Sequence, residues 1–247
     1  DACAFRWLGG DWAVADGLGV LLAHYGTGVP VECNAAVREI DWSGSDIRVT
    51  GSRGTIRARK VIVTVSTGVL ATQQIQFSPR LPPWKRDAIN ALTMGHCTRI
   101  GLAFAQPLPT DLPDEFTIRS GEEEPLHYRC RPFERDYIEV VTGGRQAEWM
   151  ERSGEAATLD FVLHRLKDLL GGQAKLDVRK KIVTAWTGDP WTHGAYSSAL
   201  PGHADARRSY AQAIDERIFF AGEAALPRHY STVHGALFSG EETAARM

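Results

Sequence analysis

Gly222 and Glu223 directly follow an apolar run, Ile218 to Ala221, that is typical of a buried strand. Some ten residues later, Thr232 precedes a run of small residues that predicts a closely packed helix. A lone carboxylate at the end of a strand repels phosphate, but it can accept hydrogen bonds from sugar-alcohol hydroxyls such as those of a flavin's ribityl chain. The helix start would offer unpaired N–H groups and a positive dipole end to the flavin's pyrimidine edge, which gains negative charge on reduction. The segment therefore indicates part of a dinucleotide site, with a C-terminal helix packed on a sheet as the alternative.

The glycine fingerprint that usually holds a dinucleotide's pyrophosphate does not occur in this sequence. Two G-x-G pairs are present, Gly17-Leu-Gly19 and Gly26-Thr-Gly28, and neither is followed by the third glycine. Neither belongs to a strand-turn-helix unit with an acidic residue about 20 positions later. Both pairs are better explained as helix and turn glycines.

Composition excludes several other functions. The formal charge of −2 and the pI near 6.5 give no general attraction to nucleic acid or to an anionic membrane. No apolar stretch approaches the roughly 20 residues of a membrane helix. The eight histidines form no HxxxH or HExxH pair, so no metal site is expected. The four cysteines show no CxxC spacing, which indicates reduced thiols; a cytoplasmic location is favoured, although the sequence does not fix the compartment.

The order of periodic segments predicts a mixed α/β fold. Four helices are expected: after the turn at the start of 11–25, beginning at the prolines 82–83, over 155–170, and after Thr232. Strands are expected within 30–65 and at 98–105, 137–142, 181–186 and 218–221. On the strand at 98–105, Arg99, Gly101 and Ala103 should share one face, and Ile100, Leu102 and Phe104 the other.

Eight stretches, in order along the chain, resemble the flavin-dependent amine oxidases. The resemblance is nearest to polyamine oxidases and lysine-specific histone demethylases. The stretches are DWAVADGLGVLLAHY, PVECNAAVREIDW, VIVTVSTGVL, IQFSPRLPPWKRDAI, VVTGGRQAEWM, AWTGDPWTHGAYS, IFFAGE and YSTVHGALFSGEETA. The resemblance implies a partial FAD-binding domain and a mixed-sheet substrate domain. We expect FAD-domain strands and a connecting helix over 1–70, the substrate domain over 71–185, and a carboxyl-terminal FAD-binding segment over 186–247.

The same resemblance assigns roles to the residues that would bind FAD. Glu223, after Gly222, resembles the residue that binds the ribityl chain, and the backbone of Thr232 and Val233 resembles the piece that meets the pyrimidine edge. Val37 resembles the valine whose backbone holds the adenine.

Three aromatic residues resemble those beside the flavin ring. Trp186 and Trp191 would contact the cofactor, and Tyr196 would form one wall of a substrate cage; ordinary core packing is the alternative for all three. Ala195 stands where monoamine oxidases bond a cysteine to the flavin, which implies noncovalent FAD. Thr232 stands where those enzymes have a second cage tyrosine, which favours a polyamine-oxidase-like or demethylase-like relative.

Arg99 aligns with the family lysine that holds a water near the flavin, so it is a candidate catalytic residue together with Tyr196. An arginine stays protonated, so it could orient water or bind an anion but could not act as a base. A surface salt bridge is the alternative.

The resemblance implies part of an FAD-dependent amine oxidase that oxidises a C–N bond of an amine or polyamine and passes the electrons to oxygen. It also implies an amino-terminal FAD-binding half outside this sequence, so the chain alone is expected to be inactive and, with apolar strands uncovered, to self-associate. Two alternatives stay open: a degenerate, non-catalytic binding or scaffold module of the same fold, and an amino-acid oxidase that uses Arg99 for a carboxylate. The coding sequence upstream of Asp1 would separate a fragment from a module.

Overall fold

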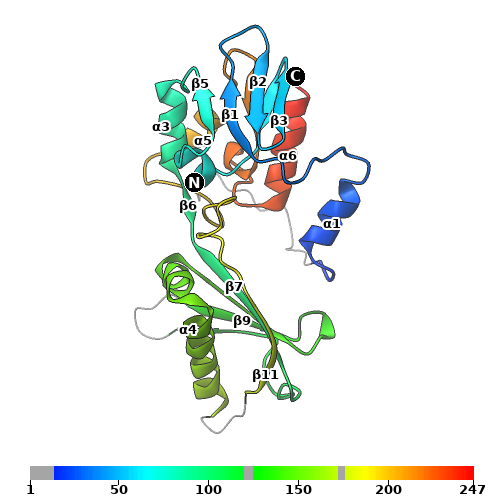
Figure 1. Cartoon of the computed structure of the whole chain (residues 1–247). Helices are drawn as coiled ribbons and strands as arrows, with labels where there is room; N and C mark the ends of the chain where they lie inside the picture. The colour runs from blue at the N-terminus through cyan, green and yellow to red at the C-terminus, as the bar shows by residue number, and fades with distance from the viewer. Residues whose placement is uncertain (1–13, 120–124, 172–175) are drawn as a thin grey trace. The chain divides into compact units, whose positions relative to one another are not determined.

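A computed structural model describes residues 14–119, 125–171 and 176–247, which divide into two compact units. The first unit contains residues 1–93 and 197–247, and the second contains residues 94–196. The mixed α/β fold class predicted from the sequence is confirmed (Figure 1). Among the helices in the described ranges, none is both long and apolar enough to cross a membrane.

The first unit combines two small sheets with short helices. Its elements are α1 (Leu18–Tyr25), β1 (Val37–Asp41), β2 (Ile47–Gly51), β3 (Gly54–Ala58), β4 (Val61–Val63), α2 (Thr67–Ala71), β5 (Gln76–Ser78), α3 (Pro83–Ala91), α5 (Ala206–Ala211), β13 (Ile218–Phe220), η2 (Glu223–Ala225) and α6 (Val233–Ala244). One sheet has the strand order β3-β2-β1-β5, and the other consists of β13 and β4 running parallel.

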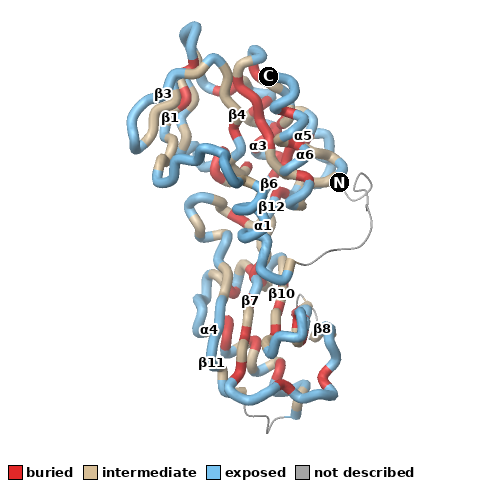
Figure 2. Tube along the Cα trace, turned by 90° about the vertical axis from the view of Figure 1, so that its right-hand side faces the viewer, coloured by how far each residue is buried: buried red, intermediate tan, exposed pale blue. Residues whose placement is uncertain are grey.

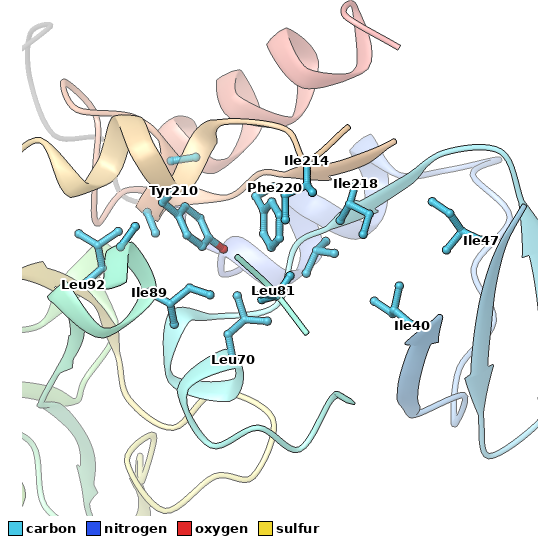
Figure 3. Packing of buried hydrophobic residues seen from close by; sticks show 14 residues of the cluster. Ile40, Ile47, Leu70, Leu81, Ile89, Leu92, Tyr210, Ile214, Ile218 and Phe220 are labelled. Atoms are coloured by element: carbon cyan, nitrogen blue, oxygen red, sulfur yellow. The ribbon is translucent and has the colours of Figure 1, made fainter. Parts of the chain in front are cut away.

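The core of the first unit gathers side chains from both ends of the sequence. Ile40 and Ile47 from the amino-terminal strands, Ile89 from α3 and Phe220 from β13 are all buried in one cluster (Figure 3). All three residues of β13 are buried, as its uniformly apolar sequence predicts. The helix α1 is an exception, because Leu18, Leu21 and Leu22 are about half exposed in the described structure.

The second unit is an antiparallel sheet with a long helix. Its elements are β7 (Cys97–Phe104), β8 (Glu115–Ile118), β9 (Leu126–Cys130), η1 (Pro132–Glu134), β10 (Ile138–Gly143), α4 (Gly144–Leu170) and β11 (Val178–Val183). The strand order is β11-β7-β10-β9-β8, and every pairing in it is antiparallel. β6 (Leu92–Gly95) and β12 (Tyr196–Ala199) form a separate two-stranded sheet.

The alternation predicted for the strand at 98–105 is confirmed in β7. Ile100, Leu102 and Phe104 are buried, whereas Arg99 is exposed and Gly101 and Ala103 are intermediate (Figure 2). The predicted helix at 155–170 also forms, and it turns Val162 and Leu166 into the core. It is preceded by further helical turns, and Gly154, with φ 86°, separates the two parts of α4.

Lys85 fixes the helix α3 within the first unit. Its fully buried Nζ donates hydrogen bonds to the carbonyl oxygens of Tyr210 (2.5 Å), Gln212 (2.6 Å) and Ser209 (3.2 Å) at the end of α5. The same Nζ lies 3.9 Å from the centroid of the Phe220 ring. A cation is favourable at the carboxyl end of a helix, so Lys85 joins α3 to α5 and β13.

Replacing Lys85 by methionine should destabilise the chain. Lys85→Met leaves three carbonyl oxygens without their donor, and we expect a loss of about 3 kcal/mol in the free energy of unfolding, measured by urea denaturation. Lys180→Met, at an exposed position of β11, is the control and should change the stability by less than about 0.5 kcal/mol. Equal effects of the two substitutions would contradict the role of Lys85.

The stability that involves Lys85 should also depend on pH. Burial lowers the pKa of Lys85 from 10.5 to about 7, so between these values the unfolded chain binds more protons than the folded chain. The free energy of unfolding of the unmodified chain should therefore rise from pH 7 toward pH 10 relative to that of Lys85→Met. A difference between the two that stays constant with pH would refute this expectation.

Candidate functional site

The candidate site residues are divided between the two units. The first unit holds Val37, Gly222, Glu223, Thr232 and Val233. The second unit holds Arg99, Trp186, Trp191 and Tyr196.

Gly222 forms an open turn between β13 and Glu223. Its φ of 127° is a conformation that side chains rarely allow, and a Cβ built on it meets no atom within 4 Å. Its N–H donates to Ser239 Oγ of α6 at 3.1 Å, so the turn is fixed on that helix. The glycine therefore leaves space at the point where the carboxylate follows.

The Glu223 carboxylate accepts three hydrogen bonds from the chain. Oε1 accepts from the Ser197 N–H (2.8 Å), and Oε2 accepts from the Ser197 hydroxyl (2.8 Å) and the Ser231 N–H (2.7 Å). A carboxylate offers about four acceptor positions, so about one is left for a further donor. We expected ligand hydroxyls to be the partners of Glu223, and the structure adds these protein donors.

The start of α6 matches the helix predicted after Thr232. Thr232 Oγ1 accepts a hydrogen bond from the Gly235 N–H (3.0 Å) and donates one to the His229 carbonyl oxygen (2.7 Å). The N–H groups of Val233 and His234 have no hydrogen-bond partner among the described residues. These two donors lie at the positive end of the helix dipole, so they suit an electron-rich ligand edge.

Val37 opens β1 and packs against the same apolar cluster that contains Ala224 and Ala225, the residues directly after Glu223. The adjoining backbone is tightly packed, since a Cβ on Gly51 would lie 2.5 Å from the Ala36 carbonyl oxygen. Val37 therefore packs against the cluster that contains the residues after Glu223, and its role toward an adenine stays a prediction.

Arg99 is half exposed and ion-paired. Its guanidinium lies 2.5 Å from a Glu139 carboxylate oxygen, and its side chain keeps 55% of its accessible surface. Arg129 contacts the other oxygen of Glu139 at 3.7 Å. Beside Arg99, the space over Gly101 is covered by Ile182. Glu139 is thus the specific partner of Arg99 in the salt bridge that the sequence left open as an alternative.

Trp186, Trp191 and Tyr196 present aromatic surface rather than filling the core. Their exposed fractions are 42%, 68% and 38%, and none belongs to the core cluster of the second unit. Core packing therefore does not explain these three residues. The role beside a flavin that the resemblance assigned to them stays a prediction.

The backbone of the 186–196 segment is fixed by short contacts. Gly194 donates to the Trp186 carbonyl oxygen (2.8 Å), and the Glu151 carboxylate accepts hydrogen bonds from the Thr187 N–H (2.8 Å) and hydroxyl (3.0 Å). The Tyr196 ring lies directly on Gly95, where a Cβ would be 3.1 Å from it. Burial raises the pKa of Tyr196, so its hydroxyl stays neutral at physiological pH.

A buried arginine that the sequence did not indicate lies next to the candidate carboxylate. Arg207 is 0% exposed, and its guanidinium donates to Ser197 Oγ at 2.7 Å and lies 4.3 Å from the centroid of the Tyr230 ring. Arg207 stands in an Arg-Arg pair on α5, and nothing in that pair distinguishes the buried arginine from its exposed neighbour.

The first unit offers about one open acceptor and two open donors, which can bind a polar ligand. The second unit, taken by itself, offers an aromatic surface that can bind an organic cation. Within the described ranges, no group of three or more His, Cys, Asp or Glu side chains could hold a metal ion. The three cysteines in those ranges are free thiols, and Cys3 lies outside them.

Comparisons with known proteins identify one family. A sequence model of the family described as flavin containing amine oxidoreductase matches residues 6–247. Lysine-specific histone demethylase 1 homolog 1 of Oryza sativa subsp. japonica is 32% identical over 230 residues, which are 89% of this chain and 27% of that protein. Lysine-specific histone demethylase 2 of Homo sapiens is 29% identical over 98% of this chain and 31% of its own length.

Polyamine oxidase 4 of Oryza sativa subsp. japonica is also similar, with 28% identity over 94% of this chain and 48% of that protein. The chain therefore spans between about a quarter and a half of the length of these relatives.

The turn before α6 should not tolerate a side chain at Gly235. A Cβ there would lie 1.8 Å from the His229 carbonyl oxygen, so Gly235→Ala must displace the Thr232 cap and should cost about 1 to 3 kcal/mol in the free energy of unfolding. Gly240→Ala in the same helix is the matched control, because its Cβ meets nothing within 4 Å. That control should be neutral or stabilising by up to about 1 kcal/mol, and thermal denaturation followed by circular dichroism measures both.

Proposed function

Because this chain belongs to the flavin-containing amine oxidoreductase family, we propose that it forms part of the FAD site and of the substrate-facing surface of an amine oxidase. The substrate would be an amine or a polyamine, and the enzyme would oxidise one of its C–N bonds. Relatives that carry the names polyamine oxidase and lysine-specific histone demethylase support this class.

One observation carries the proposal: within the first unit, Glu223 and α6 offer polar groups that suit the ribityl chain and the pyrimidine edge of a flavin. About one acceptor position on Glu223 remains for a ribityl hydroxyl, next to the space that Gly222 leaves. The unpaired N–H groups of Val233 and His234 would hold the pyrimidine edge. These residues therefore fit FAD, and Val37 would contribute backbone contacts to its adenine.

The flavin would supply the redox chemistry, accepting a hydride equivalent from the substrate and passing the electrons to oxygen. The residues of this chain would bind and orient. Trp186 and Trp191 would contact the ring system, and Tyr196, held neutral on Gly95, would form an apolar wall beside the amine. Ala195 offers no sulfur, so FAD would be held without a covalent bond.

The pairing of Arg99 bears on the choice between substrates. Glu139 already accepts the Arg99 ion pair, so a substrate carboxylate would have to compete with it. This favours an amine substrate over the amino-acid oxidase alternative. Arg99 would orient a water or shape the surface and would not act as a base, because arginine does not release its proton.

The experiment uses the protein encoded by the full reading frame that contains this chain. The purified protein, supplied with FAD, is tested for peroxide formation from spermine, from an N-methylated lysine peptide and from an acidic amino acid. We expect peroxide from one of the first two. Peroxide from the acidic amino acid alone would favour the Arg99 alternative, and FAD binding without any turnover would favour a non-catalytic module.

For the 247-residue chain alone, we expect a colourless preparation. The pyrophosphate carries the main charge of FAD, and no glycine fingerprint in this sequence can hold it. The remaining polar contacts each contribute only about 0.5 to 1.5 kcal/mol in competition with water. Absorbance near the flavin bands after gel filtration with added FAD measures the retention.

The same gel filtration tests self-association. In the described structure β4 pairs only with β13, so one edge of β4 is open to another strand. A monomeric, yellow protein with close to one flavin per chain would show that the glycine fingerprint is dispensable here.

A further inference from the structure

We propose that Arg207 is a positioning residue of the flavin site: through the Ser197 hydroxyl it orients the Glu223 carboxylate, so that one acceptor position stays available for a ribityl hydroxyl. This inference rests on the proposed function. It extends that function to Arg207, which in that proposal contacts neither the substrate nor the cofactor. Its evidence is a chain of buried and partly buried hydrogen bonds within the first unit.

The first link is the hydroxyl of Ser197, which is 1% exposed. Arg207 Nη1 donates to Ser197 Oγ at 2.7 Å, and Ser197 Oγ donates to Glu223 Oε2 at 2.8 Å. A hydroxyl that accepts from a guanidinium has its own proton directed elsewhere, here to the carboxylate. Such consecutive bonds polarise one another, so the cation strengthens the bond that holds Glu223.

The second link is the backbone around Ser197. The Ser197 N–H donates to Glu223 Oε1, and Arg207 Nη2 donates to the Ser197 carbonyl oxygen at 3.3 Å. Arg207 Nη1 also reaches the carbonyl oxygen of Ala224, directly after Glu223, at 3.3 Å. Arg207 therefore contacts Ser197, which donates to the Glu223 carboxylate, and Ala224, which directly follows Glu223.

The third link joins the network to the start of α6. The Ser231 N–H donates to Glu223 Oε2 at 2.7 Å, and the Ser231 hydroxyl donates to the Ser197 carbonyl oxygen at 2.9 Å. Ser231 directly precedes Thr232, the cap of α6. The orientation of Glu223 and the position of the unpaired α6 donors are thus set by one network.

The charges of this network are unusual for a purely structural cluster. A fully buried guanidinium is costly unless its donors and charge are matched, and hydrophobic residues of similar volume often replace buried ion pairs without loss of stability. The titratable groups that interact electrostatically are Arg207, Glu223, Tyr230 and Tyr210. Holding a carboxylate in a fixed orientation is the task that such an arrangement performs and an apolar cluster does not.

The test measures amide hydrogen exchange in the flavin-free chain. The Ser231 N–H reports on Glu223, whereas the Ala221 N–H, which donates to the Val63 carbonyl oxygen at 3.1 Å, reports on the β4–β13 pair. In Arg207→Met, we expect the protection of Ser231 to fall about tenfold more than that of Ala221. Arg207→Lys, which keeps a cation, should recover part of the loss.

Arg208→Met is the matched control. Arg208 is the neighbour of Arg207 on α5, but its side chain is 75% exposed and pairs with Asp205 at 3.3 Å. It should leave both amides unchanged. Should Arg207→Met not fold, Ser197→Ala removes the hydroxyl link and keeps the cation, and it should show the same selective loss at Ser231. Equal losses at Ser231 and Ala221 in these variants would reduce Arg207 to a structural role and overturn the proposal.

A second arm measures FAD dissociation from the full-length protein by the fluorescence of the released flavin. We expect dissociation about tenfold faster in Arg207→Met and unchanged in Arg208→Met, because a misoriented Glu223 loses a bond to a charged acceptor. Unchanged dissociation in Arg207→Met also overturns the proposal. A full-length protein that binds no FAD instead refutes the proposed function, while the exchange experiment still decides whether Arg207 orients Glu223.

Discussion

The buried charge of Arg207 is the constraint on which the first unit's candidate site depends. With no exposed surface, the guanidinium needs acceptors close by, and it finds them in Ser197, in the Ala224 carbonyl oxygen and in the face of the Tyr230 ring. These partners come from β12, η2 and the turn before α6, so satisfying one cation assembles three separate segments. The carboxylate of Glu223 is held where they meet.

The helix α5 carries this constraint to the rest of the unit. Its six residues are too few to form a stable helix alone, so tertiary contacts must hold it. Arg207 is anchored in its first turn, and Lys85 of α3 binds the carbonyl oxygens at its end. Tyr210, between these two sites, is fully buried against Phe220 of β13. The buried side chains of Arg207 and Lys85 and one aromatic pair therefore connect the core to the candidate flavin turn.

In the second unit, the segment that carries the exposed aromatic rings, residues 186–196, is fixed by close backbone contacts. Glycines let the segment approach its neighbours: Gly194 lies against Met94, and Gly95 lies beneath the Tyr196 ring. Glu151 fixes the backbone at Thr187 from the side of α4. The backbone of residues 186–196 is thereby fixed by contacts while much of the ring surface of Trp186, Trp191 and Tyr196 stays exposed.

Elements whose signals are local could be predicted from the amino-acid sequence. The apolar run of β13, the Gly-Glu turn, the Thr232 cap and the alternation in β7 follow from side-chain pattern over a few residues, and the ordered motifs indicated the family. The partners of Glu223 and the compact unit that contains residues 71–93 could be read only from the folded chain, because both depend on contacts between residues far apart in the sequence. Arg207 and Arg208 are adjacent and identical in type, yet one is fully buried beside Ser197 and the other is exposed. Only the packing of α5 distinguishes them.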